Sequence, residues 1–238
     1  MDNAGYITLT RLSGLRREMA MVAHNIANAG TTGFRREGMV FSEFVVATDR
    51  HEPSLSMALG NTRQTSQLQG GLAQTNGSFD MAIEGEGFFQ LETPDGPRLT
   101  RAGMFTPNPA GELVNMDGHH LLDAGGAPIF VPPDARSITM ARDGTLSGDG
   151  QPFAQVGLVR PVDPLSVTRA AGTLFAVDGP VEPVEAPMIL QGFVEESNVE
   201  PLIELARMIE VQRAYEQGQR LLEREDERIR NVIQTLGR

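Results

Sequence analysis

The chain has 238 residues and a formal net charge of −11 at pH 7, with 20 arginines, no lysine and no cysteine. The missing cysteines exclude disulfides and thiolate metal sites, and the acidic balance argues against a protein that binds nucleic-acid phosphates. No stretch approaches the ~18 consecutive apolar residues that a membrane-spanning helix needs.

The first predicted element is a helix over residues 3–28. Its apolar side chains recur at intervals of three and four residues, which places them on one helical stripe that must be buried against another helix. They are Leu12, Leu15, Met19, Val22 and Ile26. The run Asn28-Ala29-Gly30 then supplies a stop, because glycine readily takes the left-handed conformation that closes helices.

An extended connector is predicted over residues 37–76. Residues 39–48 fit a strand or a short helix, and periodicity does not decide between them. Residues 60–78 are rich in Gly, Gln, Thr, Asn and Ser and contain no acidic residue. This composition is typical of a linker, although an ordinary surface loop fits it equally well. We therefore place the start of the next domain at residue 77.

The central domain, residues 77–194, is predicted to be all-β. It is punctuated by dipeptides that tolerate the positive φ of tight hairpin turns. These are Asn76-Gly77, Asp95-Gly96, Asp117-Gly118, Asp143-Gly144, Asp149-Gly150 and Asp178-Gly179. Short apolar runs lie between them, at 81–83, 88–91, 113–115, 138–140, 156–160 and 174–177. Short strands at this spacing favour a sandwich or an irregular barrel.

A second long helix is predicted near the C-terminus. Ser197 is its expected N-cap and Pro201 suits its first turn, so the helix extends to about Leu236. Its seam has the same three-and-four spacing, through Met208, Val211, Tyr215, Leu222, Ile229, Val232 and Leu236, with Gly218 and Glu225 as weak positions. A further apolar stripe covers another side of its first half, through Leu202, Leu205, Ala206 and Ile209. One partner helix cannot bury both stripes, which favours packing between subunits over a monomeric helical hairpin.

These elements predict an α+β protein in which residues 1–36 and 195–238 form a coiled-coil layer of terminal helices around a central all-β domain. The assembly interface is assigned to both helices and comprises Leu12, Leu15, Met19, Val22, Asn25, Ile26, Asn28, Leu202, Leu205, Ile209, Met208, Val211, Tyr215, Leu222, Ile229, Val232 and Leu236. Asn25 and Asn28 would fix helix register through hydrogen bonds, as polar residues do in coiled coils. Simple helix termination by Asn28 is the alternative. We also expect the helices to be poorly ordered until they assemble.

Residues that could support chemistry give no positive sign of an enzyme. The glycines at 85–87 open like a dinucleotide fingerprint, but the third glycine and the βαβ context are missing, so a turn is the better interpretation. The adjacent histidines at 119–120 would face opposite sides of a strand, which disfavours a shared metal ion. Glu84, Glu86 and Glu92 are expected on a solvated face. We therefore expect no catalytic residue, cofactor or metal, with a β-rich binding or enzymatic domain dimerised through its helices as the alternative.

The segment after the first stripe resembles a signature of the flagellar axial proteins, the rod and hook family. Residues 22–35 read VAHNIANAGTTGFR. They are similar to the family pattern A-N-N-I-A-N-x-N-T-x-G-F-K, from which His24, Gly30 and Arg35 are mild departures. Three further blocks are similar to the start of the family's β-domain, to its next hairpin and to the entry of its C-terminal helix. They are residues 78–89, residues 99–114 and residues 192–199 together with 208–216.

The resemblance implies a structural subunit of the bacterial flagellar basal body. In this family the terminal helices form an inner layer, the connector bridges layers and the β-domain faces outward, while subunits stack helically into a hollow rod that crosses the periplasm and transmits torque. The implied partners are proximal and distal rod subunits, further copies of the chain and the flagellar type III export apparatus. Such export agrees with an N-terminus that lacks the basic, apolar and small-residue segments of a cleaved signal peptide. The Met-Asp-Asn-Ala start and the modest length resemble proximal-rod members, with distal-rod members as the alternative.

Overall fold

The computed structural model describes residues 3–46 and 55–236, and their contacts divide the chain into two compact units. Unit 1 comprises the described residues of 1–27, 37–66 and 200–238, and unit 2 comprises 28–36 and 67–199. A helix near each end and a β-rich middle confirm the predicted α+β class. The three-part division predicted from the sequence, with boundaries at 36, 76 and 194, stays a prediction.

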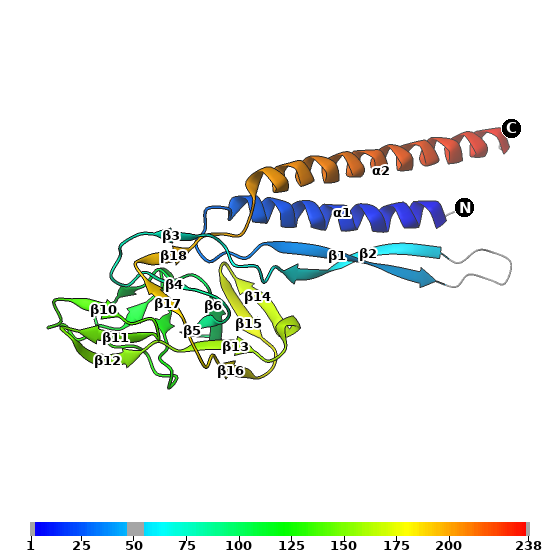
Figure 1. The fold of residues 1–238 in the computed structure, drawn as a ribbon. Coiled ribbons are helices and arrows are strands. Elements are labelled where there is room, and N and C mark those ends of the chain that lie inside the picture. Colours follow the sequence, from blue (N-terminus) through cyan, green and yellow to red (C-terminus); the bar gives the residue numbers. More distant parts are fainter. Residues whose placement is uncertain (1–2, 47–54, 237–238) are drawn as a thin grey trace. The chain divides into compact units, whose positions relative to one another are not determined.

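Unit 1 contains two helices and one β-hairpin (Figure 1). Helix α1 spans Asn3–Ala27 and α2 spans Pro201–Leu236, so both predicted helices are confirmed. Strand β1 (Glu37–Val46) pairs antiparallel with β2 (Leu55–Thr65). The undecided segment at 39–48 is therefore a strand up to Val46, and its last two positions lie outside the described residues. Within the unit α1 contacts both α2 and the hairpin.

The start of α2 differs from the prediction. Ser197 is not the N-cap, because its hydroxyl accepts the amide hydrogen two residues further on at 3.3 Å and the helix begins only at Pro201. The Glu200 carbonyl accepts from the Glu204 amide at 3.1 Å, so Glu200 occupies the cap position. The side chain of Asn198 is hydrogen-bonded to the backbone of two other segments, and the chain from 196 to 200 has no regular secondary structure.

Unit 2 is built from short antiparallel strands. One sheet has the order β14-β15-β6-β5-β9-β8-β7 with β13 joined to β5 and β16, a second has the order β10-β11-β12, and two further pairs are β17-β4 and β18-β3. The bounds are β3 Leu72–Gln74, β4 Met81–Ile83, β5 Phe88–Thr93, β6 Gly96–Thr100, β7 Thr106–Pro107, β8 Leu113–Val114, β9 His120–Leu121, β10 Ile138–Met140, β11 Thr145–Gly148, β12 Gln151–Gln155, β13 Leu158–Pro161, β14 Val167–Ala171, β15 Leu174–Val177, β16 Val181–Pro183, β17 Ile189–Gln191 and β18 Phe193–Glu195. A 3-10 turn, Pro164–Ser166, precedes β14.

The predicted strands and most of the predicted hairpin turns are confirmed. Each predicted apolar run lies in a strand or overlaps one. Asp149 and Gly150 have φ of 49° and 84° and join the paired ends of β11 and β12, which is the two-residue turn that both residues favour. The hairpin prediction is wrong at Asn76-Gly77 and Asp178-Gly179, because the strands they connect pair with other strands.

Strand β5 separates two apolar clusters of unit 2. Its consecutive residues Phe88 and Phe89 point to opposite faces, as strand periodicity requires. Phe89 packs edge-to-face on Phe105 in the larger cluster, with ring centroids 5.5 Å apart. Phe88 packs on Phe175 in the smaller one at 5.8 Å. None of the helices in the described part of the chain is long and apolar enough to cross a membrane.

Candidate functional site

The face of α1 that is buried within unit 1 follows a three-and-four spacing. Three of the predicted seam residues, Leu12, Leu15 and Val22, are buried. Two further positions of this stripe are polar, since Glu18 and Asn25 are buried whereas the predicted Met19 and Ile26 are only half-buried. The other buried residues in the described part of α1 are Thr8, Gly14 and Met21.

The inner face of α2 has the spacing of the predicted seam only in its first two thirds. Val211 is buried, and Met208, Tyr215, Gly218, Leu222 and Glu225 are half-buried. Gly218 was a weak position in the sequence, but a Cβ atom there would lie 2.6 Å from Leu12 Cδ2. The missing side chain therefore admits Leu12 between the helices.

Two groups of predicted interface residues remain on the surface of unit 1. Leu202, Leu205 and Ile209, on the first half of α2, are 83%, 52% and 44% exposed. Ile229, Val232 and Leu236, near its end, are also exposed. Large apolar side chains grouped in this way typically mark an interaction surface.

A charged contact joins the two helices where the apolar seam is interrupted. Arg207 donates to the buried Glu18 carboxylate through Nε at 2.8 Å, and its Nη2 lies 2.6 Å from the same oxygen. The hydrogen bond to Glu18 raises the pKa of Arg207 above its ordinary value, and burial opposes the shift. Glu18 is therefore tolerated on the inner face because α2 supplies its counter-charge.

Asn25 is the centre of a buried polar cluster in unit 1. Its Nδ2 donates to the Glu37 carbonyl at 2.8 Å and to Glu204 Oε2 at 3.1 Å, and its Oδ1 accepts from the Glu37 amide at 3.0 Å. The side chain is fully buried and joins α1, β1 and α2. Asn28 instead follows the end of α1 and accepts the amide and hydroxyl hydrogens of Thr31 at 3.1 and 3.2 Å. These contacts of Asn25 therefore lie within unit 1, and those of Asn28 lie directly after the last residue of α1.

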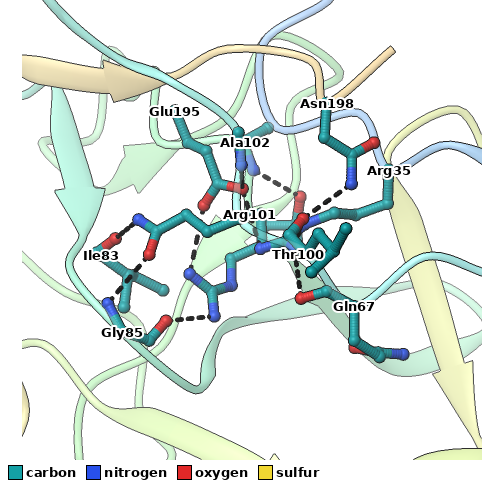
Figure 2. A network of polar contacts seen from close by, with 12 residues as sticks. Arg35, Gln67, Ile83, Gly85, Thr100, Arg101, Ala102, Glu195 and Asn198 are labelled. Atoms are coloured by element: carbon teal, nitrogen blue, oxygen red, sulfur yellow. Dashed lines mark hydrogen bonds and ion pairs between the residues drawn. The ribbon is translucent and has the colours of Figure 1, made fainter.

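A second buried polar cluster, which we call the Glu195 cluster, lies in unit 2 (Figure 2). The Glu195 carboxylate lies between two buried arginines, with Oε1 2.8 Å from Arg35 Nη2 and Oε2 3.1 Å from Arg101 Nη1. The Gly70 amide also donates to Oε1 at 3.1 Å. All three charged side chains are at most 5% exposed. One carboxylate therefore pairs with two guanidinium groups from segments far apart in the sequence.

Backbone groups complete the Glu195 cluster. Arg35 Nη1 donates to the carbonyls of Gln67 and Leu68, and Arg101 Nη2 donates to the Gly85 carbonyl at 2.7 Å. The chain itself approaches closely at Gly33, which has φ of 69° and where a Cβ atom would lie 2.2 Å from a neighbouring backbone nitrogen. This explains why the turn after α1 needs glycine.

Burial perturbs both arginines of the Glu195 cluster. Desolvation lowers the pKa of Arg35 to about 10, while Glu195 raises it and Arg101 lowers it further. Desolvation also lowers the pKa of Arg101, and the charge of Glu195 opposes the change. The guanidinium of Arg101 lies 5.3 Å from the centre of the Phe88 ring, a favourable cation–π distance. A pKa of about 10 leaves Arg35 protonated at neutral pH, so its pairing with Glu195 is ionic.

The candidate chemical residues form no reactive site. Glu84, Glu86 and Glu92 are all exposed, as predicted for a solvated face. The glycines at 85–87 lie in the loop between β4 and β5. His120 lies between two carboxylates, with Nε2 3.1 Å from Glu112 Oε2 and Nδ1 3.9 Å from Glu92 Oε2. Among the described residues no group of three or more His, Cys, Asp or Glu side chains could hold a metal ion.

Sequence reasoning missed Glu18, Glu37, Glu195 and Arg101 as structural residues. Glu195 and Arg101 each lie inside a block that carries the family resemblance, at the end of a short strand or directly after one. A charged residue in such a position is the signal that could have found them, because a charge there must be paired when it is buried.

Three family models match successive parts of the chain. A model described as flagella basal body rod protein matches residues 6–35, one described as flagellar hook protein FlgE/F/G D1 domain matches 82–148, and one described as flagellar basal body rod FlgEFG protein C-terminal matches 190–235. The central residues of the two polar clusters lie in these matched regions. Asn25 and Arg35 lie in the first, Arg101 in the second and Glu195 in the third.

Curated relatives match the chain over its whole length. The flagellar basal-body rod protein FlgF of Caulobacter vibrioides is 37% identical over 250 residues, which covers 100% of this chain and 99% of the relative. FlgF of Mesorhizobium japonicum is 36% identical over 240 residues with the same coverage. The flagellar basal-body rod protein FlgG of Agrobacterium fabrum is 31% identical over 253 residues, covering 93% of this chain and 94% of the relative.

Proposed function

Because the chain belongs to the FlgF family of flagellar basal-body rod proteins, we propose that it is a proximal-rod subunit that assembles helically through α1 and α2. It is a structural subunit of the rod and not an enzyme, since its family is structural. Assembly with other rod and hook subunits in the basal body follows from the same membership. In the proposal the assembled rod crosses the periplasm, is hollow and transmits torque, and the subunit is exported from the cytoplasm through the type III export apparatus.

The apolar stripe of Leu202, Leu205 and Ile209 is the observation that carries the proposal. These side chains are exposed in unit 1 while the opposite face of α2 contacts α1. A helix that is apolar on two sides needs two partners. A neighbouring subunit is the partner that an open helical assembly supplies, with heterologous contacts that propagate.

In this proposal the terminal helices pack as a coiled-coil layer across subunits. The interface residues that the sequence predicts on both helices belong to this layer. The segment 37–76 connects the layer with the outer region, and residues 77–194 face outward. The support is that the seams have coiled-coil spacing and that their outer positions on α2 are exposed.

We also propose that the helices gain order on assembly, since several large apolar side chains of α2 are exposed among the residues that the structure describes. Hydrogen exchange on the purified monomer should show weaker protection at 5–28 and 205–236 than the same segments show in assembled rods. Strong protection of both segments in the monomer would contradict this part of the proposal.

The triple variant Leu202→Gln, Leu205→Gln, Ile209→Gln tests the stripe. Because the side chains are exposed, the free energy of unfolding of the monomer should change by no more than about 0.5 kcal/mol per site. Complementation of a strain that lacks the native subunit should fail, with no swimming and no complete rod. Gln219→Asn, at another exposed position of α2, is the matched control. Normal swimming of the triple variant would refute the stripe as an assembly surface.

A distal-rod role is the second candidate, because the FlgG relative is also 31% identical over nearly the whole chain. Cryo-electron microscopy of basal bodies separates the two. Density for this chain in the lower rod supports the proximal role, and density confined to the upper rod supports the distal one. A closed dimer of binding domains, the alternative from the sequence, would leave the chain out of the particle.

A further inference from the structure

A groove of about 520 Å³ runs between α1 and α2 in unit 1. Apolar side chains, including Leu12 and Leu221, line it. Three arginines border it as well, Arg11 from α1 and Arg220 and Arg224 from α2. Its volume lies within the roughly 300–1,000 Å³ of cavities that enclose ligands.

The positive charge along this groove is poorly neutralised inside the subunit. Among the described residues no ion pair involves Arg11 or Arg224, and Arg220 approaches only Glu216, at 3.9 Å. An apolar groove with positive edges fits an apolar helix face that is flanked by carboxylates.

The same chain carries such a helix face at the end of α2. Ile229, Val232 and Ile233 are 41%, 46% and 64% exposed, and the preceding turn contains the acidic run Glu225-Asp226-Glu227. Two of these acids pair with arginines one turn further along the helix. Such exposed pairs contribute only about 0.3–0.5 kcal/mol, so the carboxylates can pair elsewhere.

The end of α2 cannot fill the groove of its own subunit. The helix is continuous to Leu236, and the eleven residues from Gly218 to Ile229 advance it by about 16 Å along its axis. We propose that the last turns of α2 from a second copy of this chain occupy the groove. This inference rests on the proposed assembly and names its partner, since groove and helix end form a head-to-tail contact that propagates.

Site-specific crosslinking tests the contact, because the chain has no cysteine of its own. The double variant Leu221→Cys, Ile233→Cys should give a ladder of disulfide-linked oligomers after oxidation at low salt, while each single variant should stop at dimers at most. Leu165→Cys with Ile233→Cys is the control, since Leu165 is 82% exposed but belongs to unit 2. An equal ladder from the control pair would overturn the proposal.

Charge reversal provides the second test and leaves the folded subunit intact, because the groove arginines are exposed. When Arg11→Glu and Arg224→Glu are added to the double-cysteine variant, the yield of crosslinked oligomers should fall roughly tenfold, since two attractive contacts become repulsive. Adding Glu225→Arg, Asp226→Arg and Glu227→Arg should restore it. An unchanged ladder after the groove reversal would overturn the role of these charges.

Crosslinking within assembled rods separates this inference from the proposed function. If the double variant is present in rods but gives no Leu221–Ile233 crosslink between copies, the second-copy contact is refuted while the rod function stands. If the chain is absent from rods, the proposed function itself fails. A Leu221–Ile233 crosslink between two copies in rods supports both.

Discussion

Replacing Glu195 by alanine should destabilise unit 2 more than any substitution of an exposed acid. The side chain is 1% exposed and accepts from Arg35, Arg101 and the Gly70 amide. Its removal leaves two buried guanidinium groups without their shared carboxylate. The Nε atoms of both arginines already have no hydrogen-bond partner among the described residues, so the remaining contacts cannot compensate.

The size of the effect follows from the burial of the charges. Removing one partner of a buried ion pair typically costs about 3–5 kcal/mol, and solvent screening does not reduce this at sites that are nearly inaccessible. Glu195→Gln keeps the shape and part of the hydrogen bonding but loses the charge, so we expect about half of that loss. The neighbouring Glu196 is exposed, and Glu196→Gln should change stability by less than about 0.5 kcal/mol.

Hydrogen exchange measured by mass spectrometry resolves this loss by segment. The amides of β4 and β5 should lose protection by about two to three orders of magnitude in Glu195→Ala, since ~1.4 kcal/mol corresponds to a factor of ten. The same segments of the unsubstituted chain serve as the reference. If the amides of β4 and β5 are as strongly protected in the Glu195→Ala variant as in the Glu196→Gln variant, the cluster does not stabilise unit 2 and the reasoning is refuted.

Two further substitutions test unit 1, where both tyrosines of the chain, Tyr6 and Tyr215, report unfolding by fluorescence. Asn25→Ala removes three buried hydrogen bonds and should cost about 2–4 kcal/mol in urea unfolding, whereas Asn28→Ala should cost less than about 1 kcal/mol. Equal losses would contradict the separate roles of the two asparagines. Gly218→Val should cost about 1–3 kcal/mol through overlap with the Leu12 side chain, and Leu12→Ala in the same chain should recover part of it. Strictly additive costs would show that the two residues do not share this space.

Features that depend on neighbouring residues could be predicted from the sequence. The turn at Asp149-Gly150 requires two positive φ values, and the two residue types alone favour them. The extents of both helices follow from apolar spacing, a proline at the first turn and a glycine-containing stop. The start of α2 was misplaced because the hydrogen bonds of Asn198, which join residues far apart in the chain, decide where the backbone can become helical.

Buried polar positions could not be predicted from apolar periodicity. A hydrophobic pattern selects Met19 and Ile26, yet the adjacent Glu18 and Asn25 are more buried because Arg207, Glu37 and Glu204 satisfy them. Glu195 and Arg101 are 94 positions apart, so no local window contains both. The charge of a residue predicts that it needs a partner, but only the fold identifies that partner.

This division between polar and apolar residues also indicates what drives assembly. The amide of Asn25 uses both its oxygen and its nitrogen inside unit 1, so it has little left to offer a neighbouring subunit. The stripe of Leu202, Leu205 and Ile209, in contrast, retains about half or more of its surface. Burying the rest should contribute about 1–2 kcal/mol per side chain, or about 3–5 kcal/mol for the stripe. This corresponds only to millimolar affinity, so the stripe alone cannot hold a rod together and several such contacts per subunit must act at once.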